Sequence, residues 1–223
     1  ITWKKSDRVI FESNYGVMVD NNGQVVSDLV FGDIVVKTGE NKEMYEVVLP
    51  DGREGMIKKS EASGFTEWAN RESRDVSELI AFGRTLMGTP YLWGGTSTKG
   101  LDCSGYAKTI YFSNRVVLNR DASAQYMYGQ EVSIEEPLKT LAPGDLVFFG
   151  RMRDGVKRMT HVGMYIGNGA FIHESGRVKI NSFASTSMHY SKYLRNILLG
   201  AKRIYNLPSD KGIVHISQHN WYF

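Results

Sequence analysis

The sequence predicts an α+β protein in which a small all-β segment precedes a larger domain that combines helices with an antiparallel sheet. Three observations lead to this prediction. Short apolar and β-branched runs alternate with turn residues up to residue 62, apolar residues take a helical spacing from residue 76, and short strands return after residue 145. Helices followed by a run of strands are typical of α+β folds. We place the domains at residues 1–62 and 76–223, with a polar linker at 63–75.

The N-terminal segment is predicted to form several short strands joined by tight turns. Turn signals separate its apolar runs at Asn21-Asn22-Gly23, Gly39-Glu40-Asn41 and Pro50-Asp51-Gly52. The Asp51-Gly52 pair lies between two apolar runs, which is a strong hairpin signal. So many short strands in so few residues favour a small barrel.

The larger domain is predicted to begin with two helices. Asp75 can cap the first helix, with Glu78 in the capping-box position, and Pro90 prevents its continuation. The second helix begins at about Cys103, after a glycine-rich loop. The strands that follow are predicted at residues 145–149, 160–166, 170–174, 177–180 and 200–204.

Composition narrows the possible functions. The 27 Lys and Arg residues exceed the 24 Asp and Glu residues by three, and no basic run is long enough to indicate a nucleic-acid partner. No apolar run approaches the roughly 20 residues that span a bilayer. One cysteine and two histidines could supply three zinc ligands, but no acidic partner follows the spacing of a zinc peptidase, so neither a metal nor a cofactor is expected. We expect a monomer.

The single cysteine, Cys103, is the candidate nucleophile. A lone cysteine is more often a small buried apolar residue, but such a residue belongs within the apolar stripe of a helix rather than at its entrance. A cysteine in the first helical turn meets the positive end of the helix dipole, which lowers the thiol pKa, and unpaired N–H groups that can bind an oxyanion. The adjacent Asp102 can cap the helix or receive a cationic amine, and both roles stay open.

His161 and His173 are the candidate bases, because a predicted hairpin brings them together. With a two-residue loop, Asn168-Gly169, the two histidines would point to opposite faces. With a three-residue loop, Gly167-Asn168-Gly169, they share one face as diagonal neighbours. A three-residue loop with glycine in the last position is common, and we expect this register. The other histidines are expected to have surface or packing roles.

Three blocks of the larger domain resemble the NlpC/P60 family of papain-like cysteine peptidases. They are TPYLWGG…LDCSG, APGDLVFF and HVGMYIGNGAFIHES, within roughly residues 76–205. Residues 1–62 resemble a bacterial SH3 (SH3b) domain through Gly32-Asp33 and the D-G-x-x-G hairpin. The segments GRVKINS, AKRIYNLP and HNWYF are similar to the dipeptidyl-peptidase VI branch, the γ-D-glutamyl-L-diamino acid endopeptidases.

The resemblance implies a role for individual residues. Cys103 matches the family's nucleophile, His161 its general base and His173 the third polar residue, which orients the base. The positions that line the family's substrate pocket are matched by Tyr91, Asp102, Ser104 and Ser123.

The implied activity is hydrolysis of the γ-D-glutamyl-L-diamino acid bond in peptidoglycan stem peptides with a free N-terminal L-Ala, through thiolate attack and a thioester. The cell envelope, periplasmic or secreted, is the expected location, and a cytoplasmic recycling enzyme is the alternative. An amidase or acyltransferase on the same fold, or a non-catalytic wall-binding module, are the rival functions.

Overall fold

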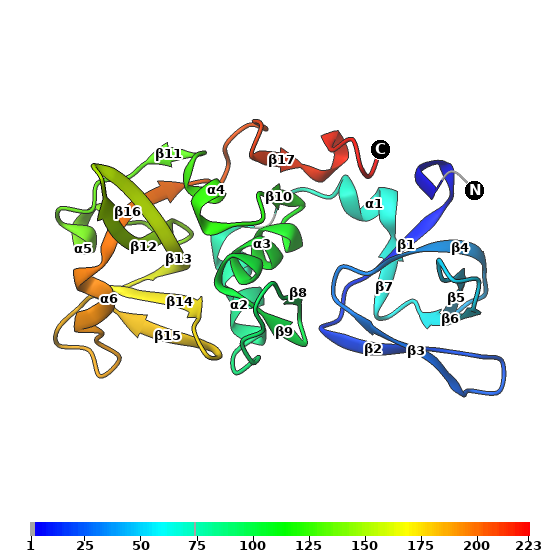
Figure 1. The fold of residues 1–223 in the computed structure, drawn as a ribbon. Helices are drawn as coiled ribbons and strands as arrows, with labels where there is room; N and C mark the ends of the chain where they lie inside the picture. The colour runs from blue at the N-terminus through cyan, green and yellow to red at the C-terminus, as the bar shows by residue number, and fades with distance from the viewer. Residues whose placement is uncertain (1–2, 74) are drawn as a thin grey trace. The chain divides into compact units, whose positions relative to one another are not determined.

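The computed structural model of the chain describes residues 3–73 and 75–223 (Figure 1). These fall into two compact units. The first contains the residues up to Glu72 together with Ile216–Phe223, and the second contains Ser73–His215. Within the described residues, no helix combines the length and the apolar character that crossing a membrane requires.

The first unit is built on an antiparallel sheet. After the 3-10 helix η1 (Trp3–Lys5), its strands are β1 (Arg8–Phe11), β2 (Tyr15–Val19), β3 (Val25–Val30), β4 (Ile34–Glu40), β5 (Met44–Val48), β6 (Glu54–Lys58) and β7 (Ala62–Gly64). Their order in the sheet is β3-β2-β6-β5-β4-β1-β7. In the described residues the two outer strands, β3 and β7, do not pair with each other. The all-β prediction is therefore confirmed, but the sheet is open and does not close into the predicted barrel.

The core of this sheet takes side chains from one face of its strands, such as Val9 and Phe11, which lie two positions apart on β1. Its buried side chains are Val9, Phe11, Met18, Leu29, Val35, Val47, Ile57 and Ala62. The predicted hairpin at Asp51-Gly52 joins β5 to β6, with Val48 opposite Glu54. Gly52 has φ +89° and its N–H donates to the Leu49 carbonyl at 2.9 Å, so the turn uses a conformation that favours glycine.

The predicted linker at residues 63–75 contains regular structure instead. Its first residues complete β7, and the helix α1 (Phe65–Ala69) follows directly. Phe65 and Trp68 lie three positions apart on one face of α1 and are both fully buried. A segment with two large buried aromatic side chains packs against the sheet, so the first unit extends to Glu72 rather than to residue 62.

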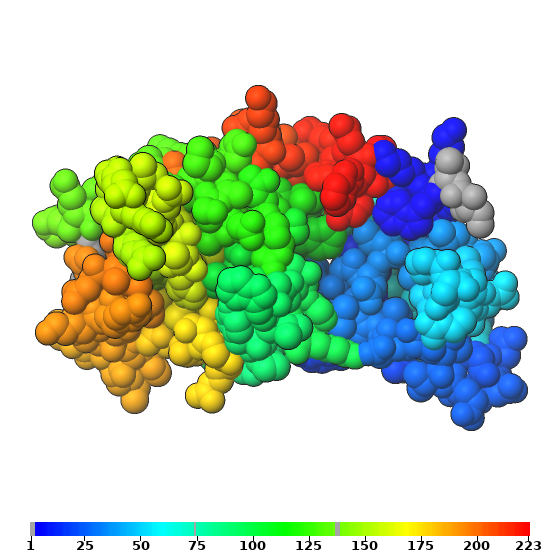
Figure 2. Space-filling view, viewed as in Figure 1, coloured from blue at the N-terminus to red at the C-terminus, as the bar shows by residue number. Residues whose placement is uncertain are grey.

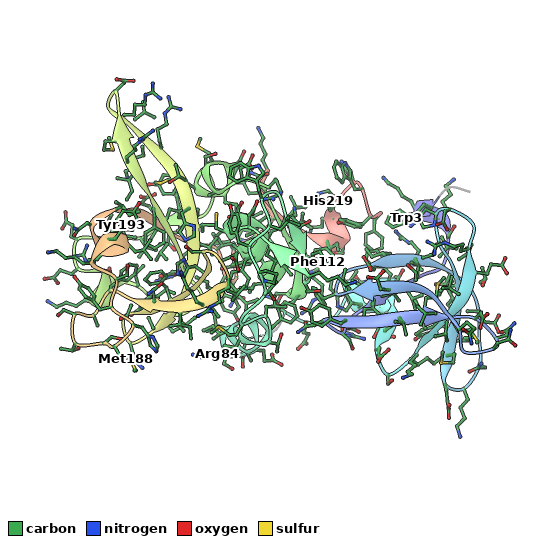
Figure 3. All side chains as sticks on the ribbon, turned by 60° about the horizontal axis from the view of Figure 1, so that its bottom comes forward. Trp3, Arg84, Phe112, Met188, Tyr193 and His219 are labelled. Carbon is green, nitrogen blue, oxygen red and sulfur yellow. The ribbon has the colours of Figure 1, made fainter. Side chains whose placement is uncertain are left out.

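The C-terminal tail, Ile216–Phe223, belongs to the first unit and not to the larger domain as predicted. After the 3-10 helix η2 (Ile216–Gln218), the ring of Phe223 stacks on that of Phe65 with centroids 5.4 Å apart. The guanidinium of Arg8 lies over the same Phe65 ring at 4.6 Å. Figures 2 and 3 show the two ends of the chain together in this unit, where the Lys4 ammonium donates to main-chain carbonyls of the tail.

The second unit combines helices with strands, which confirms the α+β class. Its helices are α2 (Val76–Thr85), α3 (Cys103–Ser113), α4 (Ala122–Tyr126), α5 (Pro137–Thr140) and α6 (Lys192–Asn196). Its main strands are β11 (Gln130–Glu131), β12 (Leu146–Arg153), β13 (Val156–Gly167), β14 (Ala170–Glu174), β15 (Val178–Ser182) and β16 (Leu198–Arg203). They form one sheet in the order β11-β16-β12-β13-β14-β15. Two small pairs accompany it: β8 (Thr96–Ser97) with β9 (Gly100–Leu101), and β10 (Val116–Leu118) with β17 (Ile213–His215).

Helix α2 begins at the predicted capping box. The Asp75 carboxylate accepts from the Glu78 N–H at 2.9 Å, and the Glu78 carboxylate accepts from the Asp75 N–H at 3.1 Å. Close packing of α2 on α3 depends on Gly83, whose carbonyl accepts from the Tyr106 hydroxyl at 2.9 Å. A Cβ atom at Gly83 would lie 3.0 Å from that hydroxyl. Helix α3 packs in turn against β13 and β14, which fixes its first residue near the sheet.

The hairpin of β13 and β14 has the predicted face but a different turn. Gly163 pairs with His173, as expected from the three-residue loop. The loop nevertheless contains only Asn168 and Gly169, both with positive φ, and the register shifts between Tyr165 and Gly167. The extra residue, Ile166, is a bulge in β13. A two-residue loop with one bulged residue, like a three-residue loop, pairs Gly163 with His173, so the residues before the bulge keep the predicted register.

Candidate active site

Cys103 is the first residue of α3 and its side chain is buried. The preceding residue, Asp102, caps the helix, and its Oδ1 accepts from the Gly105 N–H at 2.7 Å. The glycine-rich loop lies directly against this helix end, because a Cβ atom on Gly105 would be 2.0 Å from the Gly95 carbonyl oxygen. Glycine at position 105 therefore lets the loop approach and fix the entrance to the helix.

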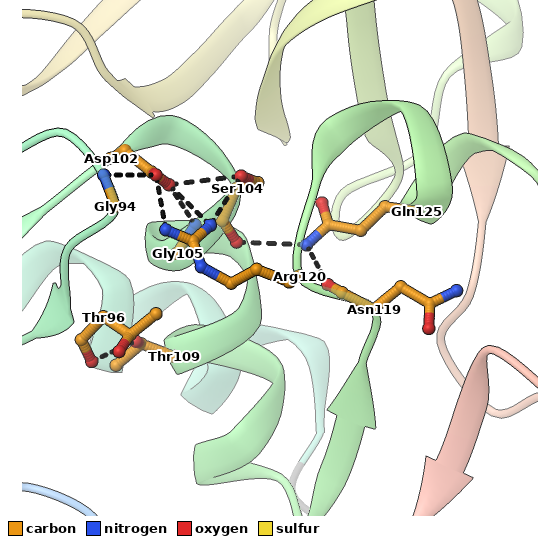
Figure 4. Close-up of polar contacts among 9 residues, drawn as sticks. All are labelled: Gly94, Thr96, Asp102, Ser104, Gly105, Thr109, Asn119, Arg120 and Gln125. Atoms are coloured by element: carbon orange, nitrogen blue, oxygen red, sulfur yellow. Dashed lines mark hydrogen bonds and ion pairs between the residues drawn. The ribbon is translucent and has the colours of Figure 1, made fainter.

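Arg120 binds the cap residue and its neighbour in a compact polar cluster (Figure 4). Its Nη1 donates to Asp102 Oδ1 and to Ser104 Oγ, both at 3.0 Å, and its Nη2 donates to Asp102 Oδ2. The Gly94 N–H also donates to Asp102 Oδ2, at 3.1 Å. Burial acts to raise the pKa of Asp102, but the hydrogen bonds and charge of Arg120 outweigh it and hold that pKa below its ordinary value. Asp102 is thus an ionised carboxylate that is already paired.

The two histidines of the hairpin form a hydrogen-bonded pair. His161 Nε2 lies 2.7 Å from His173 Nδ1, and His173 Nε2 lies 2.9 Å from Asn181 Oδ1. Aromatic rings flank the pair, with Phe149 5.4 Å from the His161 ring centroid and Phe171 5.1 Å from that of His173. Because these neighbours are apolar, the hydrogen bonds of the two imidazoles among the described residues are to each other and to Asn181.

The packing of α3 on β13 brings Cys103, the candidate nucleophile, to the strand that carries His161. The N–H of Val162, the residue after His161, lies near enough to the Cys103 thiol to act on its pKa, and so do the N–H groups of Cys103 and Ser104. The sulfur therefore lies where the start of α3 meets β13, beside the strand residue that precedes Val162. The three N–H groups form a positive site that can also stabilise an oxyanion.

Burial dominates the ionisation of all three side chains. It raises the pKa of the Cys103 thiol, although the three N–H groups act in the opposite direction. Burial also lowers the pKa of His161 to about 3, with further contributions from His173 and Lys179, and lowers that of His173 to about 4 despite the hydrogen bond to Asn181. The expectation that the helix dipole gives a lowered thiol pKa is therefore wrong for the free protein. The pair rests as a neutral thiol and a neutral imidazole.

A family model for the NlpC/P60 family matches residues 88–203, which contain the cysteine, both histidines and the Arg120 cluster. The chain belongs to the NlpC/P60 family. A γ-D-glutamyl-L-lysine dipeptidyl-peptidase of Bacillus cereus is 36% identical over 134 residues, covering 60% of this chain and 39% of that protein. The γ-D-glutamyl-L-lysine dipeptidyl-peptidase of Bacillus subtilis is 30% identical over 175 residues, covering 78% of this chain and 56% of that protein.

A solved structure of an NlpC/P60 family protein from Bacillus cereus superposes with a TM-score of 0.74 at 27% sequence identity. The superposition covers 89% of this chain and 63% of that one. The chain thus spans less than two thirds of the length of each of these three relatives.

The predicted site residues of this unit fall into two groups: those that line a surface hollow, and the histidine pair. One surface hollow is lined by Tyr91, Trp93, Gly94, Asp102, Cys103, Ser104, Arg120, Asp121, Ala122, Ser123, Met159 and Thr160. It includes the predicted nucleophile and all four predicted substrate-binding residues. His161 and His173 are not among the lining residues; His173 is buried and His161 is half-buried.

Sequence reasoning missed four residues of this site. Arg120 and Asp121 lie immediately before α4, and the charged pair in RDAS was the available signal for them. Asn181 lies on β15, two positions beyond the residue that pairs with His173, so only the register of that strand could reveal it. The exposed Trp93 in YLWGG also lines the hollow.

Glu174 is a buried carboxyl next to this site whose ionisation should control stability. It follows His173 on β14, is fully buried, and neither side-chain oxygen has a hydrogen-bond partner among the described residues. Burial raises the pKa of Glu174 to about 7, the Asp102 charge adds to this rise, and Lys179 opposes it. At pH 5 the folded protein therefore keeps a neutral side chain, whereas at pH 8 it must hold a buried charge.

We expect Glu174→Gln to stabilise the protein increasingly as the pH rises. An unfolded glutamate ionises near pH 4.5 and the folded one near pH 7, so wild type loses about 3 kcal/mol across that interval relative to the variant. Urea unfolding of both proteins at pH 5 and pH 8 measures the change in this difference. Glu135→Gln, at an exposed position, is the matched control. A difference that does not vary with pH would contradict the assignment.

Proposed function

We propose that this chain is a cysteine peptidase that hydrolyses the γ-D-glutamyl-L-diamino acid bond of peptidoglycan stem peptides. The observation that carries the proposal is the position of Cys103 at the start of α3, near the N–H of Val162 on the strand of His161, whose imidazole is hydrogen-bonded to His173. Two relatives with the name γ-D-glutamyl-L-lysine dipeptidyl-peptidase support the choice of bond.

The geometry supports a two-step reaction. As the Cys103 sulfur attacks the carbonyl carbon, His161 takes the thiol proton, and N–H groups at the start of α3 stabilise the oxyanion. His161 then gives this proton to the leaving amine, and a thioester remains on Cys103. Water then attacks the thioester as it gives a proton to His161. The C–S bond breaks, His161 returns this proton to the Cys103 sulfur, and the acid product leaves. Because the thiol pKa is raised and the imidazole pKa is lowered, the proton moves when substrate binds or reacts, not before.

Asp121 is the carboxylate that we propose for binding the free amino group of the substrate. Asp102, the residue first considered for this role, already binds the Arg120 guanidinium with both oxygens. Asp121 lines the same hollow, is exposed, and makes no side-chain hydrogen bond to the start of α4. An exposed carboxylate beside the nucleophile can pair with an ammonium group without breaking an existing ion pair.

The test uses L-Ala-γ-D-Glu-diamino acid peptides with a free or an acetylated amino terminus, with products identified by mass. We expect wild type to cleave the γ-D-glutamyl bond and to prefer the free amine. Asp121→Asn should lower kcat/KM for the free peptide about tenfold or more, which corresponds to about 1.4 kcal/mol, and leave the acetylated peptide unaffected.

Asp154→Asn, at an exposed turn position outside the hollow, is the matched control and should behave as wild type. Absence of cleavage at the γ-D-glutamyl bond by wild type would refute the proposed function. Equal loss on both peptides would leave the function in place and refute the amine contact.

The remaining proposals concern the chain as a whole. We propose that the first unit is an SH3b-type module, supported by its short antiparallel strands and its Asp51-Gly52 hairpin. We also propose a location in the cell envelope, because relatives include a probable peptidoglycan endopeptidase, LytE, of Bacillus subtilis, which is 38% identical over 132 residues. A monomeric state is the accompanying expectation.

A further inference from the structure

We propose that Asn181 is a positioning residue that fixes the tautomers of the His161–His173 pair. In this arrangement Nδ1 of His161 carries the lone pair that accepts the Cys103 proton. The inference deepens the proposed peptidase function and rests on it, but the hydrogen-bond arrangement that carries it is independent of which peptide is cleaved.

The strand register places Asn181 on the face of the two histidines. In the pairing of β14 with β15, His173 lies opposite Lys179, and Phe171 lies opposite Asn181. Asn181 is therefore the diagonal neighbour of His173 on the same face of the sheet, within reach of a side-chain hydrogen bond. The distance from His173 Nε2 to Asn181 Oδ1 is 2.9 Å.

A backbone carbonyl determines which end of the Asn181 amide faces His173. Asn181 Nδ2 donates to the His189 carbonyl oxygen at 3.1 Å. A carbonyl oxygen can only accept, so the NH₂ group must lie on that side and Oδ1 on the other. The same carbonyl accepts from the Ser182 N–H at 2.9 Å, which holds it in place.

The direction of each hydrogen bond then follows in sequence. Oδ1 of Asn181 can only accept, so the proton of neutral His173 is on Nε2, and its Nδ1 is left as an acceptor. His161 Nε2, which lies 2.7 Å from that Nδ1, must therefore be the donor. A neutral His161 with its proton on Nε2 has a free lone pair on Nδ1, as a general base requires.

Among the described residues, no other side chain in contact with the pair can replace Asn181 in this role. The ammonium of Lys179, on the same face, has donors only and cannot hold a proton on His173 Nε2. Phe149 and Phe171, which flank the rings, are apolar. Without the amide oxygen, His173 can carry its proton on Nδ1 and donate it to His161. The proton of His161 would then move to Nδ1, the atom that must stay free.

The test compares three variants of the full chain. Asn181→Leu removes the acceptor. Asn181→Asp keeps an acceptor toward His173 and gives up the donor to the His189 carbonyl, so it separates the two contacts of the amide. Ser182→Ala is the matched control, because it removes the hydrogen bond from Ser182 Oγ to the Gly169 carbonyl, 3.1 Å, on the same strand. Circular dichroism checks that each variant folds, and Asn181→Ala replaces the leucine variant if the latter does not.

The decisive measurement is ¹⁵N NMR of histidine-labelled protein at pH 7, which distinguishes Nδ1–H from Nε2–H. We expect Nε2–H for both histidines in wild type, Asn181→Asp and Ser182→Ala, and a mixture with Nδ1–H in Asn181→Leu. The rate of Cys103 alkylation by iodoacetamide and kcat/KM should fall between about tenfold and 10⁴-fold in Asn181→Leu, the range for loss of an orienting group or of the correct tautomer.

Unchanged ring tautomers in Asn181→Leu would overturn the inference. If activity were lost while the tautomers stayed unchanged, Asn181 would have a structural role alone. Loss of the Nε2–H forms in Asn181→Asp would also overturn the inference. The tautomers would then depend on the hydrogen bond from Asn181 Nδ2 to the His189 carbonyl and not on the acceptor that faces His173. The tautomer measurement needs no substrate. If wild type cleaves no stem peptide but shows the expected tautomers, the proposed function fails and this inference stands.

Discussion

Replacing Cys103 with alanine is expected to abolish hydrolysis of the stem peptide and to leave the fold intact. The sulfur is the atom that would form the thioester, and no other group in the hollow can replace it in that step. Losses of a nucleophile reach about 10⁶-fold in kcat, with residual rates due to binding and oxyanion stabilisation. Measurement of kcat/KM with L-Ala-γ-D-Glu-diamino acid and comparison of circular dichroism spectra test both parts.

The chain itself provides a chemical control for this prediction. Cys103 is the only cysteine in the sequence, so iodoacetamide should inactivate wild type with a single adduct per chain and leave Cys103→Ala unmodified. Because burial raises the pKa of the thiol, alkylation of the free protein should be slower at neutral pH than for an exposed cysteine. A kcat/KM above a tenth of the wild-type value in Cys103→Ala would contradict the assignment of Cys103 as the nucleophile.

Local patterns predicted the elements that depend on neighbouring residues. The capping box at Asp75 and the helix start at Cys103 both rest on contacts within one turn, and the structure contains both. The hairpin was predicted with the correct face although its loop is shorter. The face depends only on how many residues separate the two histidines without pairing across the hairpin. One extra residue has the same effect whether it lies in the loop or forms a bulge at Ile166.

Contacts between distant residues were beyond the reach of these patterns. Arg120 is 18 residues from Asp102, with which it forms the ion pair, and no spacing rule connects the two. The domain boundary was misplaced for a related reason. Phe65 stacks on Phe223, at the far end of the chain, and the local sequence around residue 65 gives no sign of this contact. The direction of the pKa shift of the Cys103 thiol likewise depends on burial, and the position of Cys103 at the start of a helix does not reveal how buried it is.

Replacing His161 with alanine is the second change with a large expected effect. In the proposed mechanism the His161 imidazole accepts the thiol proton and returns it to the leaving amine, so its loss should reduce kcat/KM to nearly the level of Cys103→Ala. The double variant should be no worse than either single variant, because nucleophile and base act as one unit. His173→Ala should lose less activity, about 10- to 1000-fold, because in the proposed mechanism His173 orients His161 through their hydrogen bond and does not itself react.

The pH profile distinguishes this base from an ordinary exposed histidine. Burial lowers the pKa of His161 to about 3, so the neutral, active form of the imidazole persists as the pH falls well below the ordinary value of 6.5. The acid limb of kcat/KM should therefore lie below pH 6 in wild type. His189→Ala is the matched control, because its side chain is exposed and the substitution keeps the main-chain carbonyl that accepts from Asn181. An acid limb near pH 6.5, or His161→Ala with more than a tenth of wild-type activity, would assign the base to another residue.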